Sequence, residues 1–239
     1  MREVQIGGLR TRITGGTEGK GGGRGPLVLL LHGFGAPGDD LLSLADTLDV
    51  PTGTRFVFPE GPLTLRFGPR DACAWWIIDM ARIAADQAVG RIRDLSQEIP
   101  KGLAPARETM LVFLKEVEQY LNADPRKTIL GGFSQGAMLS CDVMLRTRQP
   151  YAGLIQLSGT LLAVEEWVPL LQNRKGLPVF QSHGMQDEIL PHLGAERLRD
   201  TLTHAGLSVE WHSFRGGHEI PRAVLKGLGP FITKVATRT

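Results

Sequence analysis

A serine between two glycines is the residue of this sequence best suited to chemistry. The stretch TILGGFSQGAML, at positions 128–139, passes from an apolar run to a helix-forming run, and Ser134 stands at the change. The pattern Gly-x-Ser-x-Gly lets a strand turn sharply into a helix, which exposes the serine hydroxyl and aims N–H groups of the helix start at the same place. The pattern also arises by chance in glycine-rich chains, so its position after a strand matters most.

A serine hydroxyl is a weak nucleophile that needs a histidine base and an acid to orient that base. When the serine sits at a strand-to-helix turn, the acid and then the histidine follow it along the chain. Asp187 in SHGMQDEILP follows one apolar run directly, and His218 in FRGGHEIP follows the last strand-like run. Asp142 lies on the serine's own helix, and Glu188 is the alternative acid. We therefore predict that Ser134, Asp187 and His218 act together.

The strands that must position these side chains are indicated by runs of apolar residues in which polar and apolar residues do not alternate. Such runs are typical of parallel strands buried on both faces. The predicted strands are 26–33, 54–59, 128–133, 152–159 and 177–184, with a later edge strand at 208–214. Helical patterns lie between them at 37–48, 102–122 and 192–206. The alternation predicts an α/β fold with a mostly parallel central sheet and helices on both faces.

Two glycine-rich stretches suggest nucleotide binding, but each has a better interpretation. In segment 15–25, glycine and a strand follow Lys20, whereas a phosphate-binding loop needs Ser or Thr and a helix. We predict a flexible hairpin connection there. GFGAPG at 33–38, with Glu60 downstream, matches a dinucleotide-binding pattern. However, Pro37 has no N–H group and two aspartates follow, so a phosphate is disfavoured and no cofactor is predicted.

The segment 61–99 fits the alternation poorly and carries two adjacent tryptophans, Trp75 and Trp76. We predict a small cap over the carboxyl edge of the sheet; the alternative is an ordinary loop and helix packed on the core. Neighbouring residues of an extended segment point to opposite sides. One tryptophan is therefore expected to anchor the segment while the other lines the substrate pocket, unless both belong to the core.

The overall composition limits the classes of protein. With 239 residues, of which 42% are hydrophobic, the chain can bury one large core, so a single domain over 1–239 is expected. A net charge of +2 without a basic cluster argues against nucleic acid. The absence of a leader-like or 20-residue apolar run predicts a cytoplasmic chain without stable membrane insertion. Cys73 and Cys141 lack metal-ligand spacing and are expected to be free thiols.

Four motifs, from about residue 26 onward, jointly resemble one family. LHGFGAPGDDL, GGFSQGAML, HGMQDEILP and GGHEIP occur in the order found in the phospholipase/carboxylesterase family of α/β-hydrolases, which includes the acyl-protein thioesterases. The resemblance implies an α/β-hydrolase fold, hydrolysis of carboxylic esters or thioesters, and no metal or organic cofactor. By motif, Ser134 is the nucleophile, Asp187 the acid and His218 the base, while backbone N–H groups of Phe34 and Gln135 bind the oxyanion.

The substrate class stays partly open. WWIID within 61–99 is more similar to bacterial esterases of the family than to eukaryotic thioesterases, which favours small esters with short to medium acyl chains. A thioesterase or lysophospholipase on the same machinery is the alternative. A dinucleotide-dependent enzyme and a non-catalytic binding protein are more remote ones. A small-molecule ester is the expected partner, and a homodimer is an option.

Overall fold

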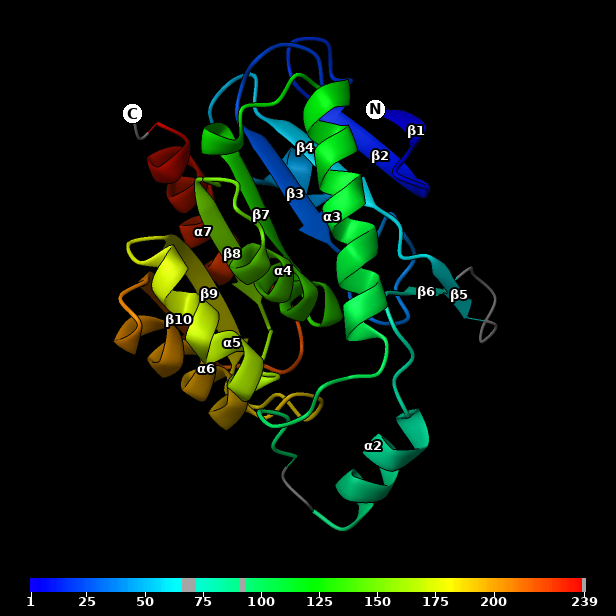
Figure 1. Ribbon diagram of the computed structural model, residues 1–239, viewed down its shortest axis with the longest axis vertical. Helices are drawn as coiled ribbons and strands as arrows, with labels where there is room; N and C mark the ends of the chain where they lie inside the picture. Colours follow the sequence, from blue (N-terminus) through cyan, green and yellow to red (C-terminus); the bar gives the residue numbers. More distant parts are fainter. Residues whose placement is uncertain (66–71, 91–92, 238–239) are drawn as a thin grey trace.

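The computed structural model describes residues 1–65, 72–90 and 93–237, and eight strands of this part form one sheet (Figure 1). The strand order is β1-β2-β4-β3-β7-β8-β9-β10. Pairing is antiparallel from β1 to β4 and parallel from β4 to β10. The strands are β1 Arg2–Ile6, β2 Leu9–Gly15, β3 Leu27–Leu31, β4 Arg55–Pro59, β7 Thr128–Phe133, β8 Gly153–Leu157, β9 Pro178–Gly184 and β10 Ser208–Phe214. The predicted mostly parallel sheet is confirmed.

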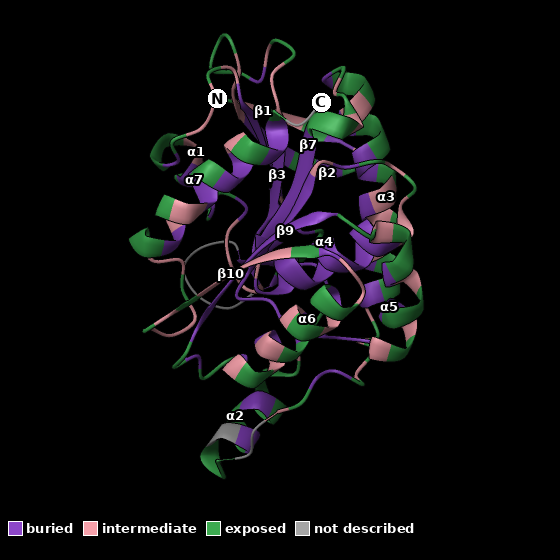
Figure 2. Cartoon of the chain, turned by 90° about the vertical axis from the view of Figure 1, so that its left-hand side faces the viewer, coloured by how far each residue is buried: buried purple, intermediate pink, exposed green. Residues whose placement is uncertain are grey.

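Helices cover both faces of this sheet (Figure 2). One face carries α3 Leu103–Tyr120, α4 Gln135–Arg146, α5 Val164–Leu171 and α6 His192–His204, and the other carries α1 Leu44–Thr47 and α7 Arg222–Ala236. Successive residues of β3 alternate between the two cores: Leu29 and Leu31 pack on the first face, Val28 and Leu30 on the second. This double burial is why the strand is apolar throughout.

Three predictions of local structure were wrong or incomplete. The hairpin of β1 and β2 was not predicted, although Gly7 and Gly8, both with positive φ, form the two-residue turn that favours such a hairpin. Segment 15–25 is not a hairpin connection, because it leads from β2 to β3 while β4 lies between them. The helix predicted at 37–48 is confined to Leu44–Thr47. Residues 37–43 form successive tight turns instead, as expected for a start rich in glycine and aspartate.

The described residues of segment 61–99 lie beyond the carboxyl ends of the parallel strands (Figure 1). It contains a small antiparallel pair, β5 Leu63–Leu65 and β6 Ala72–Ala74, and the helix α2 Met80–Ala88; its residues 66–71 and 91–92 lie outside the described part. Its end is fixed to the body through hydrogen bonds from Val164 N to Ser96 O (2.8 Å) and from Ala163 N to Glu98 O (3.1 Å). Across the described residues, no helix combines the length and apolarity needed to cross a membrane.

A buried carboxylate joins α3, α4 and α5. Asp142 of α4 is fully buried and accepts hydrogen bonds from Arg107 (2.5 Å), Arg146 (2.8 Å) and the indole N–H of Trp167 (2.8 Å). Removing the carboxylate would leave the two arginines with only the partly exposed Glu166 as counter-ion and the Trp167 indole N–H without its acceptor, which is strongly destabilising. Asp142→Ala should therefore lower the free energy of unfolding by about 3 kcal/mol or more, measured by urea denaturation.

Asp200→Asn is the matched control for that prediction. Asp200 pairs with Arg199 on the exposed surface, and such pairs contribute little to stability. If both variants lost a similar amount of unfolding free energy, the buried ionic group would not be the source of the stabilisation.

Candidate active site

Ser134 occupies a sharp turn between β7 and α4. Its backbone has φ 53° and ψ −117°, a conformation rare for a residue other than glycine, and the residue is 9% exposed. The flanking glycines are required by a close approach of β3. A Cβ atom on Gly136 would lie 2.1 Å from the carbonyl oxygen of Leu31, and one on Gly132 would lie 2.5 Å from the same oxygen. The two glycines therefore permit a turn that holds the serine at the end of the strand.

Asp187 and His218 meet at the carboxyl ends of β9 and β10. His218 Nδ1 lies 2.6 Å from Asp187 Oδ2, and Oδ1 accepts the N–H groups of Ile189 (2.9 Å) and Leu190 (2.8 Å). Burial alone would raise the pKa of Asp187, but hydrogen bonds from His183 and His218 hold it well below its ordinary range. The carboxylate therefore stays ionised and fixes His218 with Nδ1 as the protonated nitrogen.

The histidine ring also lies next to the serine turn. Phe133, the neighbour of Ser134, packs against His218 with ring centroids 4.8 Å apart. Within the described part of the chain, no hydrogen bond joins the Ser134 hydroxyl to His218. Such bonds commonly shorten only when substrate is bound. The three predicted residues thus follow the ends of β7, β9 and β10 and lie at the carboxyl ends of the parallel strands.

The two predicted oxyanion donors flank the serine. Gln135 begins α4, so its N–H group has no acceptor within the helix. The loop after β3 approaches from the other side, since a Cβ atom on Gly33 would lie 3.4 Å from the Cβ of Ser134. Phe34 follows in this loop. Both N–H groups therefore belong to backbone segments that adjoin the serine.

Two further histidines contact the site, and the sequence analysis assigned no role to them. His183, fully buried, places Nε2 3.2 Å from Asp187 Oδ2 and 2.7 Å from Leu190 O. His32 donates from Nδ1 to Gly33 O (2.7 Å) and accepts at Nε2 from Gly61 N (2.9 Å), while burial lowers its pKa. Both stand in a His-Gly pair at a strand end, and that repeated pair was the available signal.

Trp75 and Trp76 do not divide into one exposed and one buried ring. Their exposed fractions are 2% and 3%, and both belong to the core on the α3 side of the sheet. Gly102 makes room for Trp76, because a Cβ atom there would lie 2.2 Å from the tryptophan Cβ. Both residues also line an open groove of about 810 Å³ between α3 and the start of α2.

Glu60, the acid that a dinucleotide-binding site would need, already forms an ion pair. Glu60 pairs with Arg12 at 3.0 Å, and a Cβ atom on Gly38 would lie 2.3 Å from the same carboxylate. This pair therefore packs against the loop that a dinucleotide would have to approach.

A mostly parallel sheet with a strained serine turn, followed in sequence by an acid and a histidine at later strand ends, defines an α/β-hydrolase. A family model described as Phospholipase/Carboxylesterase matches residues 18–236. The chain belongs to this family, as predicted, and is an ester hydrolase.

Relatives and solved structures agree with this assignment. Acyl-protein thioesterase 1 of Cryptococcus neoformans var. neoformans serotype D is 33% identical over 194 residues, covering 73% of this chain and 71% of that protein. The protein of the same name from Kluyveromyces lactis is 29% identical over 87% of this chain and 91% of its own. Esterase PE8 superimposes with a TM-score of 0.78 and 28% identity over 97% of this chain and 100% of that chain. The Bacillus cereus carboxylesterase, 18% identical with a TM-score of 0.66, covers 95% of this chain and 94% of its own and shares the fold.

Proposed function

We propose that the chain hydrolyses carboxylic esters with short to medium acyl chains through Ser134, Asp187 and His218, by way of an acyl-enzyme. The observation that carries the proposal is the 2.6 Å contact between His218 Nδ1 and Asp187 Oδ2 beside the strained serine turn. With Nδ1–H directed at the carboxylate, Nε2 is the nitrogen left to accept the serine proton.

The proposed reaction has two halves. Ser134 Oγ attacks the ester carbonyl as His218 Nε2 takes its proton, and the N–H groups of Phe34 and Gln135 bind the oxyanion. His218 then donates that proton to the leaving alcohol. Water repeats the sequence on the acyl-enzyme and releases the carboxylic acid. Asp187 stays ionised and stabilises the charged imidazole in both halves.

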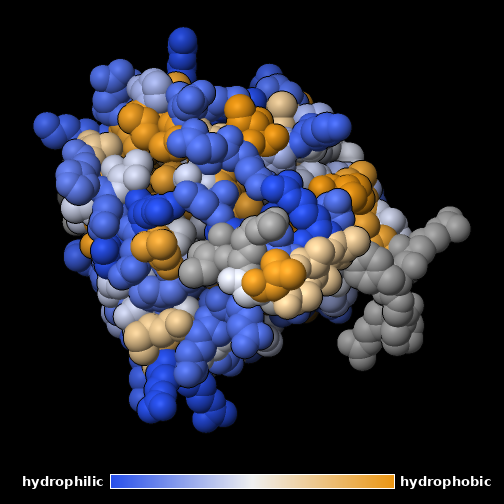
Figure 3. Space-filling model, turned by 90° about the horizontal axis from the view of Figure 1, so that it is seen from below, coloured by the Kyte–Doolittle hydropathy of each residue, from blue (hydrophilic) through white to orange (hydrophobic). Residues whose placement is uncertain are grey.

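Apolar side chains around the site favour an acyl substrate. Figure 3, seen from the end where the parallel strands finish, shows apolar groups among hydrophilic ones. Exposed apolar residues of the segments there are Leu63, Ile77, Met80, Met185 and Ile189. A thioester is the second candidate, because relatives that are 33% and 29% identical are named acyl-protein thioesterase 1. Lysophospholipids would use the same chemistry.

We also propose that 61–99 is a small cap within a single domain over 1–239. Three further statements stay predictions. Cell fractionation tests the cytoplasmic location, titration with nucleic acid tests the absence of a nucleic-acid partner, and light scattering tests whether the chain forms a homodimer.

Labelling with a fluorophosphonate tests the proposed nucleophile. The probe phosphonylates an activated serine, so peptide mapping should find the adduct on Ser134, and p-nitrophenyl butyrate should slow the labelling. A purely binding protein would not be labelled. An adduct on any other serine would transfer the role. Comparing kcat/KM for acetyl, butyryl and octanoyl p-nitrophenyl esters and for the butyryl thioester then decides the substrate class.

Asp187 makes stability depend on pH. Its pKa is lowered in the folded state, so its stabilising contribution is complete above the unfolded value of about 3.9 and is lost as pH falls toward the folded-state pKa. We expect the free energy of unfolding to fall between about pH 5 and about pH 3, and to fall less in Asp187→Asn. Equal slopes in urea titrations of both proteins would show that this carboxyl is not the source.

A further inference from the structure

We propose that the side chains of Gln135 and Trp75 are positioning residues that set the two oxyanion donors relative to each other. The segment Ala72–Trp76, here called the brace, is bonded to both backbone segments that carry the proposed donors. This inference rests on the proposed function, because it assigns a role to contacts around the oxyanion site.

The first connection joins the brace to the serine turn. The Gln135 side chain is fully buried; its Oε1 accepts the backbone N–H of Trp75 (2.9 Å), and its Nε2 donates to Trp76 O (2.8 Å). A carboxamide supplies one acceptor and one donor, as this pair of backbone groups requires. Residue 135 is therefore held to the brace through its side chain while its own N–H group remains at the helix start.

The second connection joins the brace to the loop after β3. The indole N–H of Trp75 donates to His32 O at 3.0 Å. Cys73 O accepts from Gly35 N at 2.9 Å, and Cys73 N donates to Ala36 O at 3.0 Å. These bonds fix the loop on both sides of the proposed donor.

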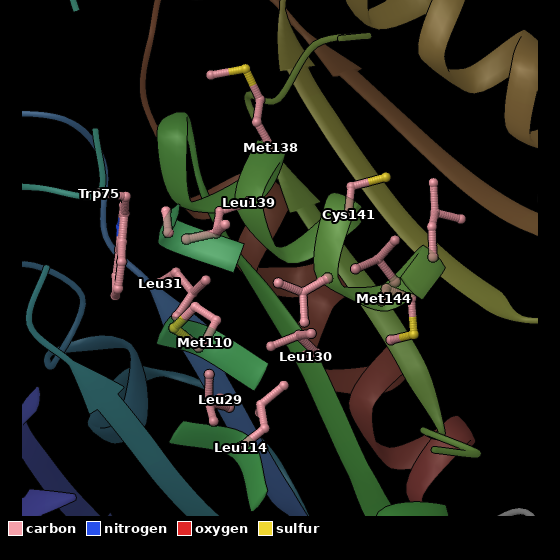
Figure 4. Close-up of a cluster of buried hydrophobic side chains, with 14 of the residues drawn as sticks. Leu29, Leu31, Trp75, Met110, Leu114, Leu130, Met138, Leu139, Cys141 and Met144 are labelled. Carbon is pink, nitrogen blue, oxygen red and sulfur yellow. The ribbon is translucent and has the colours of Figure 1, made fainter. Parts of the chain in front are cut away.

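The brace thus spans two segments that follow different strands. Figure 4 shows the Trp75 ring in the same buried cluster as Leu31 at the end of β3 and Leu139 of α4. Because Trp75 and Gln135 are buried, their hydrogen bonds are made in a low-dielectric environment with little competition from water. Oxyanion donors act only when they lie about 2.7–3.1 Å from the developing charge, so their relative position matters for the rate.

Two conservative variants test the brace. Gln135→Met and Trp75→Phe keep the bulk of each side chain and leave both proposed donor N–H groups in place. We expect kcat on p-nitrophenyl butyrate to fall about tenfold or more, while KM stays within about twofold of the wild-type value. This fall in kcat should be smaller than the one caused by removing an oxyanion donor altogether. The inhibition constant of a trifluoromethyl ketone, whose tetrahedral adduct places an oxyanion at the same donors, should rise by a similar factor.

Matched controls separate positioning from stability. Trp167→Phe removes an indole hydrogen bond to Asp142, and Gln181→Met removes a carboxamide bond to Ala195 O; both residues are buried. These variants should lower the melting temperature while kcat and the inhibition constant stay near wild type.

The outcomes are distinct. Wild-type kcat in both brace variants would overturn the inference. So would a fall in kcat with unchanged inhibitor affinity, because that result indicates only structural damage. If the wild-type protein shows no Ser134-dependent hydrolysis, the proposed function fails and the positioning role falls with it. Ser134-dependent hydrolysis with unaffected brace variants leaves the proposed function standing.

Discussion

Ser134→Ala should lower kcat for p-nitrophenyl butyrate by about 10⁴-fold or more while the protein remains folded. The expected loss is large because the proposed mechanism forms the covalent intermediate on this serine, and without it only binding and oxyanion stabilisation of a water attack remain. The turn itself is maintained by the flanking glycines and by the Ser134 N–H bond to Leu157 O, at 2.8 Å, which alanine retains. Steady-state kinetics and circular dichroism measure the two halves of the prediction.

Ser140→Ala on the same helix is the matched control. Ser140 is buried and its hydroxyl donates to Ala137 O at 2.8 Å, away from the serine turn. Its loss should affect stability more than kcat. If Ser134→Ala kept more than about a tenth of the wild-type kcat, the nucleophile would have to be a different group.

Asp187→Asn should lower kcat by about 10⁴-fold, although it differs from the wild type by one atom and one charge. An amide can donate to His218 Nδ1, which favours the tautomer with the proton on Nε2, and that ring cannot accept the serine proton. Glu188→Gln makes the same chemical change one residue further on and should reduce kcat only slightly. The reverse ranking of the two variants would move the acid role to Glu188.

Much of the site could be predicted because its residues follow strands that are visible in the sequence. The run at β3 is apolar because alternate residues enter two cores, and the same is true at β7 and β9. Strand ends therefore located Asp187 and His218 without knowledge of their contact. The β1–β2 hairpin was missed because its strands alternate polar and apolar residues, whereas unbroken apolar runs located most of the other strands. The helix expected at 37–48 shortened because turn-forming residues outweigh its apolar pattern.

Other features of the site could not be predicted from the sequence. The bonds of Gln135 to the brace join residues about 60 positions apart, and nothing local distinguishes a buried carboxamide from an exposed one. The His-Gly pair marks His32 in the sequence, but it does not show that the ring reaches Gly61, 29 positions further along the chain. Such contacts depend on the mutual placement of loops from different strands, which periodicity does not encode.

The contrast between α4 and α2 has a consequence for how this protein can diversify. Residues 135–145 of α4 are all buried, whereas α2 is mostly exposed. Substitutions in α4 therefore disturb packing on several sides, while most substitutions in α2 change few contacts and cost little stability. Selection can thus alter the residues beyond the strand ends over many generations while the serine turn stays constant. Under the proposed role of 61–99 as a cap, substrate preference and stability become separately evolvable properties of one chain.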